Sequence, residues 1–431
     1  MKTVHLAYAS TGLDLRVPEA ADGLIGQHVE AIQRPRDAVL EALARPIGSV
    51  PLADLIGARR PRSIAITISD ITRPVPNRVF LPPLLDCLGA AGVSNRQIVI
   101  IIGTGMHRPS TPQEREVLVG PEVLGRIEVI DHAPHDSPAL LRISDDPPIS
   151  VNRRFAEADF RIVTGLIEPH FMAGYSGGRK GVCPALVDLG TIQRFHGYAT
   201  LADPRADNGV LDGNPCHEIA LGVARKVGVD FLVNVAITRD RQIAGVYAGD
   251  LEAAHEAGCR QVAEWTSAGI DGPYDLVVTS GGGLPLDATF YQTVKGMCGA
   301  LPALGPDSTL LIVSECREQI GSKAYADLML SYGNDWRRFL ADIAASSQTR
   351  LDQWEFQMQC RVLERIGMER LWLVTDGIPA DAQRRLGVTP ILGEGDARQR
   401  AQRAIDAFVA ARPIARVAVI PDGPYTTLKV Q

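Results

Sequence analysis

Short, uninterrupted runs of Val, Ile and other apolar residues recur along this chain, and longer amphipathic stretches separate them. Two of the runs are SIAITIS at 63–69 and QIVIII at 97–102. Such runs are typical of parallel strands buried on both faces, and their alternation with helical patterns favours α/β layers with right-handed crossovers. The further expected strands lie at 127–130, 160–164, 231–237, 276–279, 309–313, 371–375 and 417–420. The expected helices lie at 81–92, 113–119, 217–226, 251–267, 323–331, 335–345, 356–366 and 397–411.

A glycine-containing turn divides these elements into two groups. GIDGP at 269–273 follows a long helical pattern and precedes a new strand, as an interdomain connection does. The length of 431 residues also suits two or three domains, at roughly 150 residues per domain. The sequence therefore predicts two α/β domains with mostly parallel sheets, at 1–270 and 271–431.

The composition excludes several classes of protein. The 44 Lys and Arg against 50 Asp and Glu give a net charge of −6, which offers no reason to expect nucleic acid. No two of the seven cysteines fall within four residues of each other, so a cysteine cage for zinc or for an iron–sulfur cluster is not expected. The apolar runs are too short to span a bilayer, and the N-terminus shows no secretory signal. We expect a soluble, cytoplasmic protein with no nucleic-acid or membrane partner.

Polar residues follow several of the expected strands directly. Asp70 and Arg73 come after the first strand, His107 after the second and His170 after the fourth, and Gly281 begins a glycine triplet after the sixth. Ligands in open α/β sheets bind outside the carboxyl ends of the strands, so these residues are predicted to converge. Each alone has a structural explanation, as a loop ion pair, a helix cap or a satisfied histidine. Together they favour a functional site.

The densest polar motif is the glycine-rich segment AGYSGGRKG at 173–181. Its glycines let backbone N–H groups approach an anion closely, and Ser176, Arg179 and Lys180 add donors and charge, which predicts phosphate binding, although a flexible connection has the same composition. The segment lacks the spacing of a Walker A loop and of the GxGxxG dinucleotide loop, which disfavours a nicotinamide dehydrogenase. Lys180 within it has a second possible role as a point of covalent attachment.

Two further features lie downstream of this segment. His196 is either a helix-end histidine or a ligand for nickel, copper or zinc. Tyr291, Gln292 and Lys295 share one helical face, which either faces solvent or binds a carboxylate. From the residues alone, the chain is predicted to be an α/β enzyme that acts on a small anionic substrate with two histidines as acid and base.

Five motifs together resemble the lactate racemase family, the 2-hydroxy-acid racemases and epimerases that use a nickel-pincer nucleotide. They are SDITRPVPN at 69–77, GTGMHRPST at 103–111, EPHFMAGYSGGRKG at 168–181, the offset of His196, and YQTVKG at 291–296. Each string alone is moderately specific, whereas their order and spacing together are strong. The resemblance implies a cofactor-binding N-terminal domain at 1–270, a C-terminal domain at 271–431 that closes over the substrate, and an active site in the cleft between them.

The resemblance also implies a role for each matching residue. Lys180 would carry the cofactor, nickel(II)-pyridinium-3,5-bisthiocarboxylic acid mononucleotide, as a thioamide, and His196 would complete the nickel coordination. His107 and His170 would be the catalytic acid and base. The residues implied to contact the cofactor are Asp70, Ile71, Thr72, Arg73, Gly177, Gly178, Lys180, His196 and Trp354. Those implied to contact the substrate are Arg73, Tyr291, Gln292 and Lys295.

The activity that follows from the resemblance is racemisation of a small, lactate-like 2-hydroxy acid. One histidine takes the hydroxyl proton while hydride leaves C2, and hydride then returns to the opposite face of the planar 2-keto acid. Maturation would need cofactor-biosynthesis enzymes as partners. Two alternatives stay open: an epimerase of a longer hydroxy acid such as a sugar acid or malate, and a cofactor-binding relative without turnover.

Overall fold

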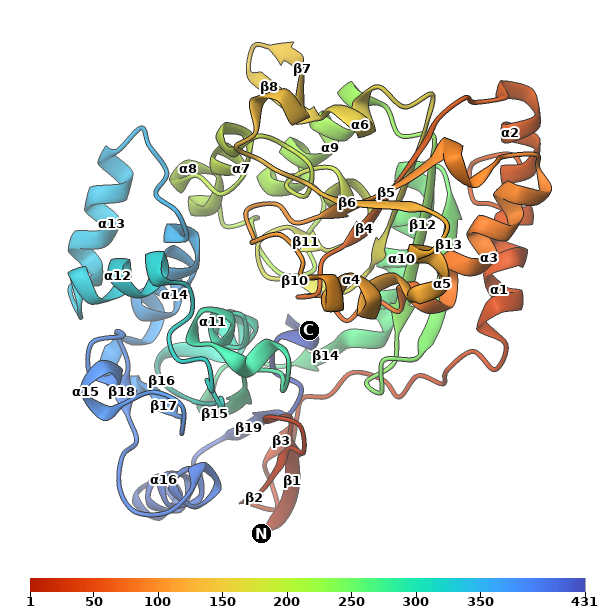
Figure 1. Ribbon diagram of the computed structural model, residues 1–431. Helices are drawn as coiled ribbons and strands as arrows, with labels where there is room; N and C mark the ends of the chain where they lie inside the picture. Colours follow the sequence, from red (N-terminus) through yellow and green to blue (C-terminus); the bar gives the residue numbers. More distant parts are fainter. Residues whose placement is uncertain (431) are drawn as a thin grey trace.

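The computed structural model describes residues 1–430, which form two lobes that each contain a six-stranded sheet (Figure 1). The first sheet has the order β13-β12-β9-β4-β5-β6, and all neighbours are parallel except the antiparallel pair β12 and β13. Its strands are β4 (Ile64–Ser69), β5 (Ile98–Gly103), β6 (Glu128–Asp131), β9 (Phe160–Leu166), β12 (Phe231–Ile237) and β13 (Ile243–Gly249).

Helices cover both faces of the first sheet, which explains its continuous apolar runs. Successive residues of β4 point to opposite faces, so Ile66 packs in one buried cluster and Ala65 in another. The helices on the Ile66 side are α1 (Pro35–Ala44), α2 (Leu52–Arg59) and α3 (Asn77–Ala90). The helices on the Ala65 side include α9 (Pro215–Val227) and α10 (Leu251–Thr266), and both begin at a side-chain cap, from Asn214 and Asp250.

The second sheet has the order β18-β17-β16-β15-β19-β3 and is parallel throughout. Its strands are β3 (Asp22–Gly23), β15 (Tyr274–Ser280), β16 (Leu304–Val313), β17 (Leu371–Val374), β18 (Thr389–Pro390) and β19 (Val417–Ile420). One face carries α11 (Phe290–Gly299) and α14 (Gln353–Ile366), and the other carries α16 (Ala397–Ala411) with the hairpin of β1 (Lys2–Leu6) and β2 (Leu13–Val17).

Smaller elements complete the described part of the chain. The helices are α4 (Pro112–Val119), α5 (Pro121–Leu124), α6 (Arg153–Ala156), α7 (Leu189–Phe195), α8 (Tyr198–Ala202), α12 (Lys323–Tyr332), α13 (Trp336–Ala345) and α15 (Ala380–Gln383). The two-stranded sheets pair β7 (Leu140–Asp145) with β8 (Pro148–Asn152), β10 (Pro169–His170) with β11 (Gly174–Tyr175), and β14 (Ser267–Ile270) with β20 (Thr427–Val430). None of the helices within residues 1–430 is long and apolar enough to cross a membrane.

The predicted strands and the α/β class agree with the structure, but the start of the chain departs from the expected division at residue 270. β3 pairs with β19, so Asp22 and Gly23 belong to the second sheet rather than to the first. The expected turn at 269–273 is in part a strand, because Ser267–Ile270 forms β14 and pairs with β20 near the C-terminus. Such short edge strands carry too few residues to show a periodic pattern.

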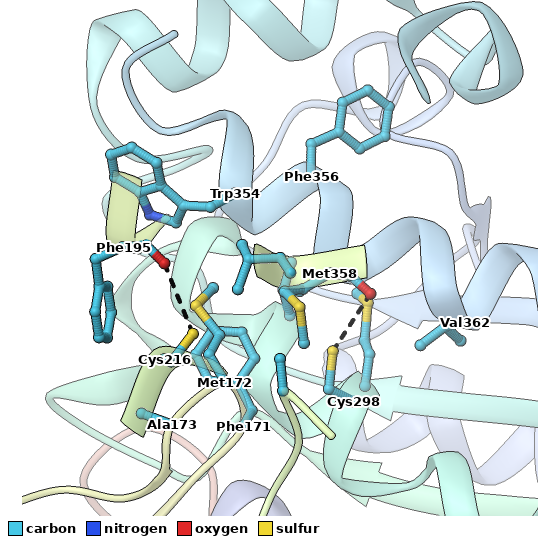
Figure 2. Packing of buried hydrophobic residues seen from close by; sticks show 14 of the residues in the cluster. Phe171, Met172, Ala173, Phe195, Cys216, Cys298, Trp354, Phe356, Met358 and Val362 are labelled. Atoms are coloured by element: carbon cyan, nitrogen blue, oxygen red, sulfur yellow. Dashed lines mark hydrogen bonds between the residues drawn. The ribbon is translucent and has the colours of Figure 1, made fainter. Parts of the chain in front are cut away.

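The apolar core continues from one lobe into the other. Figure 2 shows Phe171, Met172 and Phe195 of the first lobe close to Trp354 and Met358 of the second. All five side chains are buried in one cluster. The two lobes are therefore packed against each other, next to the strand ends that carry the predicted site residues.

The core of the first lobe gives a direct test of this packing. Ile66 is 0% exposed in the centre of β4, whereas Ile414 is 97% exposed. We expect Ile66→Ala to lower the free energy of unfolding by about 2–5 kcal/mol, and the matched control Ile414→Ala to change it by less than about 0.5 kcal/mol. Urea unfolding curves of both variants measure the difference, and equal shifts would contradict the assigned burial of β4.

Candidate functional site

The ends of β4 and β5 bring Asp70 and His107 into direct contact. His107 Nδ1 lies 2.6 Å from Asp70 Oδ2, and the Thr72 hydroxyl donates to Asp70 Oδ1 at 2.6 Å. Burial of Asp70 raises the pKa of its carboxyl, but the hydrogen bond from His107 and the charges of His107 and Arg73 outweigh burial and leave that pKa below its usual value. Because an ionised carboxylate only accepts, His107 carries a proton on Nδ1, and in a neutral ring Nε2 is then the nitrogen with a free lone pair.

The end of β9 places His170 against Lys180. His170 Nε2 lies 2.8 Å from the Lys180 Nζ, and His170 Nδ1 accepts from the backbone N–H groups of Met172 and Ala173 at 3.2 Å each. Burial, reinforced by nearby cations, holds the pKa values of both His170 and Lys180 well below their usual range. The two predicted residues thus meet in one partly buried pair, with a lysine whose neutral amine is favoured.

His196 ends helix α7, which begins at the side-chain cap from Asp188. The His196 Nδ1–H donates to the carbonyl oxygen of Ile192 at 3.0 Å, so Nε2 is the nitrogen with a free lone pair. Burial lowers the pKa of His196 to about 3, which keeps the ring neutral. A neutral imidazole held in this way is the form that ligates a metal ion.

Two aromatic residues from the second lobe fix the surroundings of His196. The Trp354 ring stacks on the His196 ring, with centroids 4.4 Å apart. The Trp354 Nε1–H donates to the hydroxyl oxygen of Tyr291 at 2.7 Å. Tyr291, predicted to contact the substrate, is thus placed behind Trp354 and orients that indole. The prediction that Trp354 lies beside the cofactor site agrees with its place on His196.

A pocket between the lobes collects the predicted anion-binding groups. Arg73 and His170 come from the first lobe and Lys295 from helix α11 of the second. Burial, with the nearby Arg73 charge, lowers the pKa of Lys295 to about 8. The full lining is Thr72, Arg73, Pro74, Glu168, Pro169, His170, Phe171, Pro285, Leu286, Lys295, Pro424 and Tyr425. Most of the wall is apolar, so the cations are the groups that can hold an anion there.

Two carboxyls that the sequence did not single out balance these cations. Glu168 lines the pocket, and Glu355 lies on α14 with 1% of its surface exposed. Burial raises the pKa of both carboxyls, while the nearby lysines and Arg73 oppose the rise. Glu168 begins the motif at 168–181, and Glu355 directly follows Trp354. Their positions beside residues already predicted for the site are the sequence signal that could have identified them.

Donor groups of the glycine-rich segment at 173–181 form hydrogen bonds within the protein rather than pointing outward. Arg179 is 1% exposed, and its guanidinium donates to the carbonyl oxygens of Ala173 and Tyr175. The Gly178 N–H donates to Asn234 Oδ1 at 2.8 Å. The expectation that Arg179 and these glycines present donors to a phosphate is therefore wrong for Arg179 and for the Gly178 amide, because both are already paired within the protein.

Gly177 and Gly178 nevertheless have a clear structural purpose. Their φ angles are +73° and +55°, which side chains rarely adopt. A Cβ at Gly178 would also lie 2.5 Å from the ring of His255. The two glycines thus permit the tight path that delivers Lys180, in the following turn, to His170.

The remaining predicted residues lie at the edges of the site. Ile71 is partly buried against the core of the first lobe. Gln292 follows the cap of α11, and its buried Oε1 has no hydrogen-bond partner within residues 1–430. Within the same residues no group of three or more His, Cys, Asp and Glu side chains is placed to hold a metal ion.

Fold and site together define a two-lobed α/β protein with a buried histidine–lysine site between the lobes. Two family models match the chain, the lactate racemase N-terminal domain at residues 8–209 and the lactate racemase C-terminal domain at residues 271–426. The chain belongs to the lactate racemase family.

Individual relatives agree with this assignment. Lactate racemase from Thermoanaerobacterium thermosaccharolyticum is 31% identical over 98% of each chain, and lactate racemase from Lactiplantibacillus plantarum is 33% identical over 90% of this chain and 89% of the relative. The solved structure of the lactate racemase apoprotein from T. thermosaccharolyticum superimposes with a TM-score of 0.89 at 30% identity, over 99% of this chain and 100% of that one. A protein from Thermotoga maritima, 17% identical with a TM-score of 0.68 over 92% of this chain and 98% of its own, shares the fold.

The contact between Asn234 and Gly178 gives a test of how the Lys180 loop is held. Asn234 is 0% exposed, and its Oδ1 is the acceptor for the Gly178 N–H. Asn234→Ala leaves that buried donor unpaired, so we expect the free energy of unfolding to fall by about 1–3 kcal/mol. Urea unfolding measures the loss. The exposed Asn95 provides the control Asn95→Ala, for which no loss is expected; equal stability of the two variants would contradict the role of Asn234.

Proposed function

We propose that the protein is an isomerase that racemises lactate or a closely similar 2-hydroxy acid. The observation that carries the proposal is the meeting of Arg73, His170 and Lys295 in one interlobe pocket, beside the buried Lys180. Relatives named lactate racemase match this chain over nearly its whole length. The apolar wall of Pro74, Leu286 and the other lining residues favours a short substrate side chain over the longer sugar acids.

We further propose that the site takes a nickel-pincer nucleotide. His196 would ligate nickel through its bare Nε2, Lys180 would be the covalent attachment point, and Trp354 would border the group. When bound, the nucleotide supplies an acceptor and donor of hydride, which the side chains of this protein cannot supply. The neutral Lys180 amine and the orphaned Gln292 Oε1 fit such a group.

The two histidines are placed to move the hydroxyl proton of the substrate. His107 presents a bare Nε2, because its Nδ1–H is held by Asp70, and so it is prepared to accept a proton. His170 has its Nδ1 occupied as an acceptor, so Nε2 is the nitrogen through which it would exchange a proton with the substrate. A racemase needs one group of each kind, since the two enantiomers present their hydroxyls in different directions.

Arg73 and Lys295 would hold the substrate carboxylate while C2 inverts. Both line the pocket, and they come from different lobes, so a bound carboxylate would join the lobes across the site. The apolar residues around them exclude water and strengthen the ion pairing. His170 lies in the same lining, which sets the proton donor beside the anchored acid.

We also propose that the protein works in the cytoplasm and receives its cofactor from separate biosynthetic enzymes. All seven cysteines are free thiols, and six of them are buried. Unpaired thiols are the usual state of cysteine in reducing compartments.

The decisive experiment uses protein produced together with the cofactor pathway. We expect conversion of each pure lactate enantiomer to a racemic mixture, bound nickel, and an intact mass increased by a covalent adduct that Lys180→Ala lacks. His107→Ala and His170→Ala should each lower kcat by at least about 100-fold, as expected for loss of a general acid or base, and His107→Ala should keep its nickel. The exposed His28 gives the control His28→Ala, for which full activity is expected.

Three results would count against parts of this proposal. Normal turnover in His107→Ala or His170→Ala would remove the role assigned to that histidine. A stable adduct on Lys180→Ala would place the attachment elsewhere. Bound nickel without turnover of any 2-hydroxy acid would favour the relative without catalysis, and turnover of only longer acids would favour the epimerase.

The Lys295 ammonium predicts a pH dependence of substrate binding. The pKa of Lys295 is lowered to about 8, so the charged form is present below that pH and is lost as the pH rises through it. We expect KM for lactate to rise roughly tenfold between pH 7 and pH 9 as the ammonium titrates. Lys295→Arg keeps a charge throughout this range and should show a flat KM. A flat KM in the unaltered protein, or a parallel rise in Lys295→Arg, would contradict the assignment.

A further inference from the structure

The His170 ring is fixed from both of its nitrogens. On one side Nδ1 accepts from the backbone N–H groups of Met172 and Ala173, each at 3.2 Å. On the other side Nε2 lies 2.8 Å from Lys180 Nζ. Both contacts are within hydrogen-bond distance and involve different ring atoms, so the proton on one nitrogen determines what the other can do.

The backbone decides where the proton of His170 resides. An amide N–H only donates, so Nδ1 must be bare and a neutral ring carries its proton on Nε2. That Nε2–H then needs an acceptor at Lys180. An ammonium group offers three donors and no acceptor, whereas a neutral amine offers a lone pair. The contact is therefore satisfied only when Lys180 is a neutral amine.

The surroundings of Lys180 also favour its neutral amine. Burial, with the charges of Arg73, Arg179 and Lys295, places the Lys180 pKa well below its usual value. The titratable groups that interact with Lys180, from the elements around it, are Arg73, Glu168, His170, Arg179, Cys183, His196, Cys216, Lys295 and Glu355.

We infer that His170 is a positioning residue for maturation: before cofactor attachment it holds the Lys180 amine neutral and oriented through an Nε2–H hydrogen bond, and attachment releases that Nε2–H for the substrate. The inference rests on the proposed attachment at Lys180. It gives His170 two successive partners, first the lysine and then the hydroxy acid, and thereby orders maturation before turnover.

The chemistry of attachment supports this order. Condensation of the Lys180 amine with a thiocarboxylic acid forms one C–N bond, breaks one C–O bond and releases water, which takes the hydroxyl group and one amine proton. No oxidant or reductant is needed. The nitrogen lone pair is delocalised in the resulting thioamide and no longer accepts a hydrogen bond, so the His170 Nε2–H loses its partner at that moment.

The first test reads the tautomer of His170 in the full-length chain produced without the cofactor pathway. Histidine ¹⁵N spectra distinguish a bare from a protonated ring nitrogen, and His170→Gln identifies the signal among the nine histidines. We expect a bare Nδ1 and a protonated Nε2 from pH 6 to pH 9. An imidazolium or an Nδ1–H tautomer at pH 7 would overturn the inference.

The second test reads the Lys180 amine by trace acetylation of the same cofactor-free chain and peptide mass spectrometry. The chain has only six lysines, so Lys226 and Lys323 on the surface serve as internal controls. Their acetylation rates should rise close to 100-fold from pH 7 to pH 9, as expected for ordinary lysines, whereas the Lys180 rate should change less than about twofold because the amine is already neutral. A Lys180 rate that rises in parallel with the controls would overturn the inference.

A pair of variants separates His170 from burial alone. His170→Phe removes the donor, so the pH at which the Lys180 rate levels off should rise and the rate at pH 7 should fall severalfold. His170→Gln retains an N–H donor of similar reach and should keep the flat profile. Identical profiles in all three proteins would show that burial alone controls Lys180. Because neither test needs cofactor or turnover, their failure would leave the racemisation assay to decide the proposed function separately.

Discussion

Shielding from water controls the protonation of a cluster of cationic side chains, and the chemistry of the site depends on it. Arg73, Lys180 and Lys295 share a partly buried region with the carboxyls of Asp70, Glu168 and Glu355. Burial lowers the pKa values of the two lysines and raises those of Glu168 and Glu355, whereas the contact with His107 holds the pKa of Asp70 below its usual value. Such a site suits the anionic substrate and the covalent step at Lys180 that we propose.

Much of the fold could be predicted because the sheets are covered on both sides. β4 and β5 have no polar face, so their apolar runs were visible without any knowledge of partners. The short strand β3 was not visible, since two exposed residues carry no pattern and its partner β19 lies almost at the other end of the chain. The antiparallel β13 was missed because Gly245 interrupts it and Gly249 ends it, and glycine weakens the pattern of a strand.

For the site, the types and the order of the residues could be read from the sequence, whereas the directions of their side chains could not. The positions of Asp70, His107 and His170 directly after their strands led to the expectation of one shared site, and the structure pairs His107 with Asp70 and His170 with Lys180. Arg179 has the same charge as Lys180 and sits beside it, yet it points into the core, because the left-handed turn at Gly177 and Gly178 determines which side chain faces which way. That turn depends on Asn234 and His255, which lie far away in sequence.

The pairing of β3 with β19 has a consequence for synthesis of the protein. β3 precedes every strand of the first sheet, whereas its partner β19 follows them all. The first lobe has all six of its sheet strands before β19 is made, so it can fold while the second lobe is still being made. β3 must meanwhile wait for its partner, and the second sheet is completed only after synthesis has reached β19.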